Sequence, residues 1–160
     1  MDRPVTPAGA RLSVRPARRT DVDAVTALDA KITGLPKPAH WGDLYRRQRK
    51  AADAPGGVIF LVATPAEEPE RVLGFILGEI RAWEFGSAPC GWVYALSVEP
   101  EAREQGVGET LLSAVSGEFR KAGMDKMRTM VARDNLLTVS FFRAEGMMAG
   151  PYIELEKDLT

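Results

Sequence analysis

The fold of this chain is decided by one stretch, which reads SVEPEAREQGVG over residues 97–108. The apolar run at residues 92–98 predicts a strand that leads into a loop, and a helix opens at Gly108. Glycines let successive backbone N–H groups turn toward one point. A helix N-terminus adds unpaired donors and the positive end of its dipole. The stretch therefore predicts an anion site that suits a pyrophosphate, with Arg103 as a charged contact at its rim.

Two familiar phosphate-binding loops do not fit this stretch. A dinucleotide fingerprint needs a third glycine, but Leu111 stands at that position. A P-loop needs lysine and then serine or threonine after its second glycine, whereas Glu109 and Thr110 follow Gly108. An ordinary tight turn before a helix remains the simpler alternative for the two glycines.

Apolar periodicity predicts ten elements along the chain. Strands are expected at residues 12–15, 58–63, 72–80, 92–98, 127–131 and 151–157. Helices are expected at residues 22–32, 40–52 and 108–122, and again from residue 136 until Gly146. The order β-α-α-β-β-β-α-β-α-β predicts an α/β fold with a mixed central sheet.

Composition limits the class of protein. The chain has 160 residues, 45% of them hydrophobic and 27% charged, with a formal net charge of −1. Such values are ordinary for one globular domain. They argue against binding to nucleic acid or to a membrane surface by charge alone. Residues 1–10 are expected to be disordered, and residues 11–160 to form the domain.

The counts of metal ligands and of long apolar runs also exclude several classes. Cys90 is the only cysteine and His40 the only histidine, so neither an internal disulfide nor a His/Cys zinc site is expected. The N-terminus has no apolar signal core, and no apolar run reaches the ~20 residues that span a bilayer. A cytoplasmic protein without a metal is the resulting expectation.

Two motifs together resemble the GNAT superfamily of N-acetyltransferases. Its signature Arg/Gln-x-x-Gly-x-Gly/Ala is matched by Arg103, Gly106 and Gly108, with Val98 and Pro100 typical just ahead of it. Residues 135–147 resemble its second motif, Asn-x-x-Ala-x-x-Phe-Tyr-x-x-x-Gly-Phe, with Asn135, Phe141 and Gly146 in place. The order of strands and helices agrees from about residue 12 onward.

The resemblance implies a single domain whose central sheet is splayed at the acyl-CoA cleft, with helices on both faces and a shortened C-terminal strand region. Acetyl-CoA is then the cosubstrate. The backbone of Leu96 and Val98 would pair with the pantetheine arm. The pyrophosphate would be held by the amides of Arg103, Glu104, Gln105, Gly106, Val107 and Gly108. Asn135, Phe141 and Phe142 would line the arm, although Asn135 is also a simple helix N-cap.

The resemblance also implies direct attack of a neutral amine on the thioester. A base or a water chain must take the amine proton, and a backbone donor on the strand that ends at Val98 would stabilise the oxyanion. Glu79, Glu84 or water are the candidate bases. The tyrosine that usually protonates the leaving thiolate is replaced by Phe142.

The missing tyrosine leaves two routes for the leaving thiolate. Either Tyr94 or Tyr152 replaces it as the acid, or the thiolate leaves without assistance. Packing alone would also explain an aromatic residue at position 94. A catalytically weak or inactive CoA-binding module with the same fold is therefore the alternative function. Glu109 is a second departure, since an acid beside the proposed phosphate site repels a phosphate unless it points away.

The acceptor amine is not identified by the sequence, and both small molecules and proteins stay open. Residues 32–41 and 83–87 are expected to contact it. Only 14 residues follow Gly146, which leaves room for one strand at residues 151–157 and leaves a sheet edge exposed. An exposed edge invites pairing with a second copy, so a homodimer is expected, with a monomer as the alternative.

Overall fold

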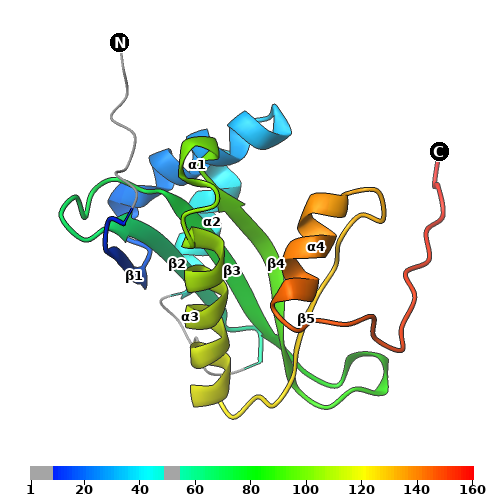
Figure 1. Cartoon of the computed structure of the whole chain (residues 1–160). Coiled ribbons are helices and arrows are strands. Elements are labelled where there is room, and N and C mark those ends of the chain that lie inside the picture. Colours follow the sequence, from blue (N-terminus) through cyan, green and yellow to red (C-terminus); the bar gives the residue numbers. More distant parts are fainter. Residues whose placement is uncertain (1–8, 49–54) are drawn as a thin grey trace. The chain divides into compact units, whose positions relative to one another are not determined.

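The computed structural model describes residues 9–48 and 55–160, and it divides into two compact units, residues 1–130 and 131–160. Most of residues 1–10, expected to be disordered, thus lie outside the described part. The first unit is built on a five-stranded sheet in the order β1-β2-β3-β4-β5 (Figure 1). Neighbouring strands are antiparallel except β4 and β5, which are parallel. The predicted mixed sheet is confirmed.

The elements of the first unit follow the predicted order. The strands are β1 (Leu12–Pro16), β2 (Val58–Pro65), β3 (Gly74–Arg81), β4 (Cys90–Val98) and β5 (Met127–Thr129). The helices are α1 (Val22–Thr33), α2 (Pro38–Gln48) and α3 (Val107–Lys121). Among the described residues, short 3-10 turns that periodicity does not predict lie at Arg19–Asp21, Glu84–Gly86 and Pro100–Ala102. No helix in the described part of the chain is both long and apolar enough to cross a bilayer.

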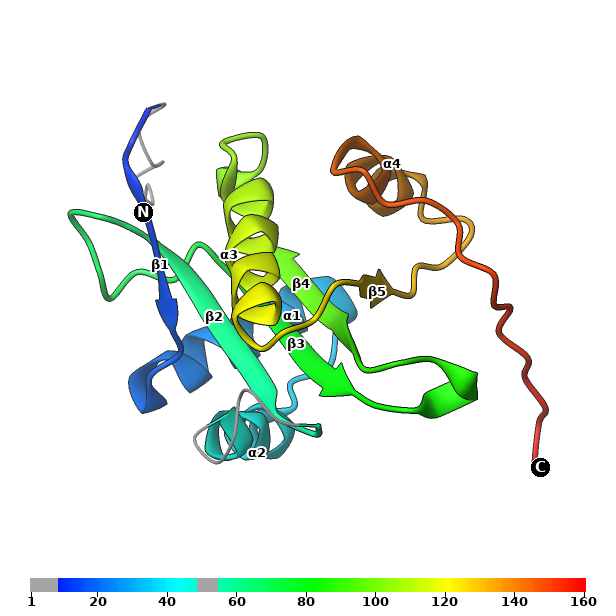
Figure 2. The same cartoon turned by 90° about the horizontal axis from the view of Figure 1, so that it is seen from below.

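Helices cover both faces of the sheet. Figure 2 shows α3 on one face, and α1 and α2 on the other. Strand β2 lies between these layers, so all eight of its residues are buried. This explains why its sequence is continuously apolar rather than alternating.

The face toward α1 and α2 is closed by an aromatic core. The Trp41 ring of α2 lies 5.1 Å from Phe75 of β3 and 6.3 Å from Phe60 of β2, measured between ring centroids. The Trp41 indole also donates a hydrogen bond to the buried Asp29 carboxylate of α1 at 3.3 Å, and Lys37 lies 2.8 Å from the same carboxylate. These contacts hold α1 and α2 together over the sheet.

The opposite face is shaped by glycines beneath α3. A Cβ built on Gly78 or on Gly91 would lie 2.5 Å from the ring of Phe119, far inside van der Waals contact. One built on Gly74 would lie 2.8 Å from the carbonyl oxygen of Ser97 and 3.1 Å from Val107. Bare backbone at these positions therefore lets α3 lie directly on β3 and β4.

A buried ion pair joins β1 and the turn before α1 to the β2–β3 hairpin. The Arg15 guanidinium binds both oxygens of the Asp21 carboxylate, at 2.6 and 3.0 Å, and donates to the carbonyl of Pro69. Burial raises the pKa of Asp21, but hydrogen bonds from Arg15 and from the Arg18 amide outweigh it and leave that pKa below its ordinary value. Asp21 directly precedes α1, but its carboxylate binds Arg15 and the Arg18 amide and caps no amide of α1.

The second unit contains α4 (Leu136–Ala144), which Asn135 caps by accepting a hydrogen bond from the Thr138 amide at 3.2 Å. The helix ends before Gly146, which has a φ of +87° as a C-terminal glycine should. The predicted last strand at residues 151–157 is wrong, because these residues form no strand and are exposed. Alternation of apolar and polar residues sets which side chains share a face, but a strand also needs a partner for its backbone groups.

Gly91→Ala tests the close approach of α3 to the sheet. The added methyl group would overlap the Phe119 ring, so the free energy of unfolding should fall by about 1–3 kcal/mol, as overpacking usually costs. Urea denaturation measures the change.

Gly117→Ala is the matched control, because Gly117 lies in α3 and a Cβ added there would meet no atom within 4 Å. An alanine there should raise the unfolding free energy by roughly 0.5–1 kcal/mol through helix propensity. A Gly91→Ala protein as stable as the wild type would contradict the described packing.

Candidate functional site

The glycine loop has the conformation that an anion site requires. After β4 ends, the chain takes left-handed backbone at Glu104 (φ +63°) and at Gly106 (φ +78°), and α3 begins at Val107. The Gly106 carbonyl accepts the Thr110 amide at 3.0 Å as the first helical bond. The amides of the first turn, from Val107 to Glu109, precede that bond and have no acceptor within the helix. They form a cluster of donors at the positive end of α3.

The side chains around this loop carry charges of both signs. Arg103, Glu104 and Glu109 are all exposed. At the start of the loop, the Glu99 carboxylate binds the Lys31 ammonium at 2.6 and 2.8 Å, which ties the loop to the end of α1. This ion pair cannot be read from the sequence, because its two residues are 68 positions apart.

Strand β4 has a half-open edge beside the loop. Its N-terminal part pairs with β5, from Gly91 opposite Met127 to Val93 opposite Thr129. The Thr129 hydroxyl donates to the Val93 carbonyl at 2.8 Å, so the peptide groups of Val93 face β5. Among the described strands none pairs with residues 94–98 on that side.

The free peptide groups on this edge belong to Leu96 and Val98. The Glu99 amide donates to the carbonyl of Leu73 at 2.7 Å, on the β3 side of the strand. Because peptide groups alternate along a strand, those of Val98 and Leu96 point to the opposite side. The strand therefore offers the two residues predicted to pair with an extended ligand.

A β-bulge interrupts β4 where the free edge begins. Leu77 of β3 pairs with Ala95, and the next residue, Gly78, pairs with Val93, so Tyr94 is an extra residue on β4. A bulge re-aims side chains locally.

Tyr94 lies in a charged environment with Glu79 of β3 and Arg47 of α2. Partial burial and the Glu79 carboxylate raise the pKa of Tyr94 to about 12, and Arg47 opposes the shift only in part. The phenol is thus protonated at neutral pH. Arg47 lies 3.4 Å from the Glu79 carboxylate. We call Glu79, Tyr94 and Arg47 the bulge cluster, of which sequence analysis found the first two.

A second ion pair lies on the hairpin formed by β3 and β4, which also carries Glu79 and Tyr94. Glu84, the other candidate base, binds Arg81 at 2.6 Å, and the Arg81 guanidinium lies 4.8 Å from the centre of the Trp92 ring. The loop after Arg81 exposes Trp83 and Phe85, both with left-handed backbone, at φ +61° and +53°. Such conformations are costly for bulky residues.

The remaining predicted site residues belong to the second unit. Asn135 is the N-cap of α4, and the rings of Phe141 and Phe142 pack edge to face with centroids 5.2 Å apart. Phe142 is buried and Phe141 is partly buried. Tyr152 lies in the exposed tail, 47% exposed. The functional roles assigned to these four residues stay predictions.

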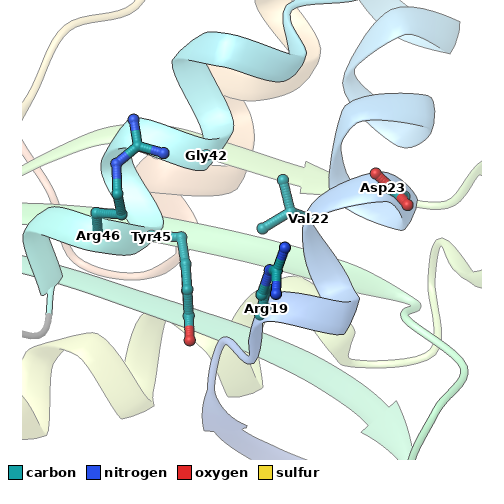
Figure 3. A pocket seen from close by; sticks show the side chains of 6 residues that line it. All are labelled: Arg19, Val22, Asp23, Gly42, Tyr45 and Arg46. Atoms are coloured by element: carbon teal, nitrogen blue, oxygen red, sulfur yellow. The ribbon is translucent and has the colours of Figure 1, made fainter.

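A groove with a volume of about 540 Å³ lies between the start of α1 and α2 (Figure 3). None of the predicted site residues lines it. The lining residues are Arg19, Val22, Asp23, Gly42, Tyr45 and Arg46. In the described part of the chain, no three side chains of histidine, cysteine, aspartate or glutamate gather as a metal site would require.

Comparison with known proteins gives one family. The family model described as "Acetyltransferase (GNAT) family" matches residues 23–147. A mycothiol acetyltransferase of Thermobispora bispora is 32% identical over 148 residues, covering 89% of this chain and 48% of the relative. One from Kocuria rhizophila is 30% identical over 105 residues, covering 66% of this chain and 34% of the relative. The chain thus spans less than half the length of either relative.

Solved structures share the fold. The aminoglycoside N-acetyltransferase AAC(6')-Iy in complex with CoA superposes with a TM-score of 0.79 at 16% identity, covering 97% of this chain and 99% of that one. The aminoglycoside 6'-N-acetyltransferase AAC(6')-Ih of Acinetobacter baumannii gives 0.75 at 15% identity, with 94% and 100% covered.

Proposed function

Because the chain belongs to the acetyltransferase (GNAT) family, we propose that it transfers an acetyl group from acetyl-CoA to a primary amine. The observation that carries this proposal is the geometry of β4 and α3. A free strand edge at Leu96 and Val98 leads directly to a loop whose amides open a helix. An extended arm that ends in a pyrophosphate has the shape and charge to use both features.

Acetyl-CoA would be held mainly by backbone groups. Leu96 and Val98 would pair with the amides of the pantetheine arm as a neighbouring strand does. The amides from Arg103 to Gly108 would bind the pyrophosphate, and Arg103 is exposed at the rim where it can add a charged contact. Glu109, also exposed, must point into solvent for a phosphate to approach. Asn135, Phe141 and Phe142 are proposed to line the arm.

The chemical step is a direct transfer. The lone pair of the neutral amine attacks the thioester carbonyl, a C–N bond forms, and the C–S bond then breaks with its electron pair going to sulfur. The amine loses one proton to a base, and the CoA thiolate takes up one proton from solvent to become the thiol. Glu79 is the proposed base, directly or through a water, since it lies at the bulge beside the free edge. Glu84 is less suited, because Arg81 binds it closely.

Tyr94 is the proposed partner of the leaving thiolate. Its raised pKa, about 12, keeps the hydroxyl protonated and available as a donor. That value lies well above the pKa of about 8.5 typical of a thiol. Tyr94 would therefore stabilise the developing thiolate by a hydrogen bond rather than give up its proton completely. Tyr152 is the alternative donor, and its position in the exposed tail supports it less.

The relatives suggest the class of acceptor. The sequence relatives reported above are named for mycothiol, and several of the matched structures are named for aminoglycosides, so we propose a small-molecule amine. A CoA-binding module without catalysis is the second candidate, favoured by Phe142 in place of the usual tyrosine.

A cytoplasmic location belongs to the proposal as well, and a free thiol at Cys90 agrees with a reducing compartment.

We also propose that the chain forms a homodimer. Residues 151–160 are exposed and include the apolar side chains of Ile153 and Leu155, 78% and 84% exposed. They alternate with Glu154 and Glu156, as a strand at an interface would. Pairing with a second copy would give their backbone groups partners and bury their apolar side chains.

Gly108→Val tests the cofactor site. A branched side chain on the first turn of α3 would block the approach of a phosphate to its amides, so affinity for acetyl-CoA should fall on the order of tenfold or more, the worth of a charge-assisted contact. Calorimetric titration measures it. Gly117→Val, further along the same helix, should bind acetyl-CoA as the wild type does, and equal affinity in both variants would rule out this loop.

Tyr94→Phe tests the reaction. Amine-dependent release of CoA should show a kcat lowered by roughly 100- to 1000-fold, as when one preorganised donor is removed from an active site, with acetyl-CoA affinity nearly unchanged. A thiol reagent follows the release over a panel of amines. An unaltered kcat in both Tyr94→Phe and Tyr152→Phe would mean that the thiolate leaves unassisted. Tight acetyl-CoA binding with no turnover for any amine would support the non-catalytic module.

Light scattering at micromolar concentration tests the dimer. The full chain should have twice its 17.5 kDa mass, and removing residues 151–160 should return it to the mass of a single chain. A monomeric full chain would end the proposal.

A further inference from the structure

The bulge cluster is electrically balanced, and this limits what it can bind. Glu79 faces Arg47 at 3.4 Å, and along the same hairpin Glu84 faces Arg81 at 2.6 Å. Each carboxylate therefore has its own guanidinium. A polycationic acceptor would meet two fixed positive charges, and a simple alkylammonium ion bound to Glu79 would leave Arg47 without its counter-charge.

The Arg47–Glu79 contact has the features of a pair that a ligand can separate. It is a single contact at 3.4 Å, with side chains 43% and 26% exposed. The Arg15–Asp21 pair of the same chain is different: it is bidentate at 2.6 and 3.0 Å, and its side chains are 14% and 3% exposed. A long, exposed, one-point contact contributes little to stability, so a ligand that gives each charge a new partner can replace it.

Both members of this pair lie beside the bulge. Glu79 follows Gly78, the partner of Val93, and Tyr94 is the extra residue of the bulge from which the free edge of β4 runs toward Leu96. Arg47 reaches the same place through its contact with Glu79. They come from the sheet and from α2, so a small molecule between them would touch both layers. The proposed acetyl donor would lie along that free edge.

We propose that Glu79 and Arg47 together select an acceptor that carries a carboxylate close to its primary amine, as a free amino acid does. This rests on the acetyltransferase function proposed above. The amine binds the Glu79 carboxylate beside Tyr94, and the acid group binds the Arg47 guanidinium. One internal ion pair is exchanged for two pairs with the ligand, so no charge is left uncompensated.

The experiment compares amino acids with their amides, which keep the size but lose the negative charge and carry a less basic amine, so the readout is the change of their ratio between variants. CoA release is measured for alanine, serine, phenylalanine, glutamate and lysine, each beside its amide. A charge-assisted hydrogen bond is worth roughly 10- to 100-fold, so Arg47→Gln should lower the acid-to-amide ratio of kcat/KM by about tenfold or more, and Arg47→Glu should lower it further.

Arg46→Gln is the matched control. Arg46 is the neighbouring arginine of α2, but its side chain lines the groove beside Gly42 (Figure 3) and pairs with Asp43. It should keep the wild-type ratio of acids to amides. Thermal unfolding of all variants shows that each is folded, and the ratio is measured within one protein, so a partial loss of folded material does not affect it.

Two outcomes overturn the proposal, and they differ from a failure of the proposed function. An acid-to-amide ratio that is unchanged in Arg47→Gln would exclude Arg47 as the group that binds the carboxylate of the acceptor, while the proposed acetyl transfer stands. Transfer to neither acids nor amides, with transfer to other amines, would exclude the acceptor class alone. Transfer to no amine at all, with acetyl-CoA bound, would contradict the function itself.

Discussion

The contact of Phe119 with the backbone of Gly78 and Gly91 is the constraint on which the rest of the structure depends. It brings α3 directly onto β3 and β4, with no side chain from the glycines between them. Because the helix is rigid, its far end is then fixed at the end of β4, where Val107 packs over Gly74. The loop from Glu99 to Gly106 spans the short gap that remains, and its amides are thereby gathered at one place.

Local signals predicted most of the fold. The predicted ends of α1, α3 and α4 agree with the structure to within a few residues, because a breaker such as Gly146 acts on backbone geometry within one turn. The predicted end of the helix at residues 40–52 lies outside the described residues. The last strand failed because pairing depends on a partner that alternation cannot reveal. The bulge at Tyr94 was missed because it arises from the register between two strands, which a single segment does not contain.

The candidate site likewise divides into residues that the sequence predicts and one that only tertiary packing brings to the site. The glycine loop, Leu96 and Val98 follow from a contiguous motif, and Glu79 and Tyr94 were found as candidates without a reason to be together. Arg47 could not be found, because only the packing of α2 through Trp41 onto Phe75 brings it to Glu79. The balance of charge at the bulge is thus a property of tertiary structure.

The bulge also makes the side chain at position 94 independent of the direction of the peptide groups at Leu96 and Val98, which a regular strand would link. Tyr94 is an added residue, so the pairing of Ala95 with Leu77 and of Val93 with Gly78 would be the same if it were absent. The peptide groups of Leu96 and Val98 would keep their direction. Evolution can therefore insert, delete or exchange the side chain at this point without altering the backbone edge beside it. A scaffold of this kind can change its catalytic side chain or its acceptor while the backbone edge proposed to bind a common acetyl donor stays the same.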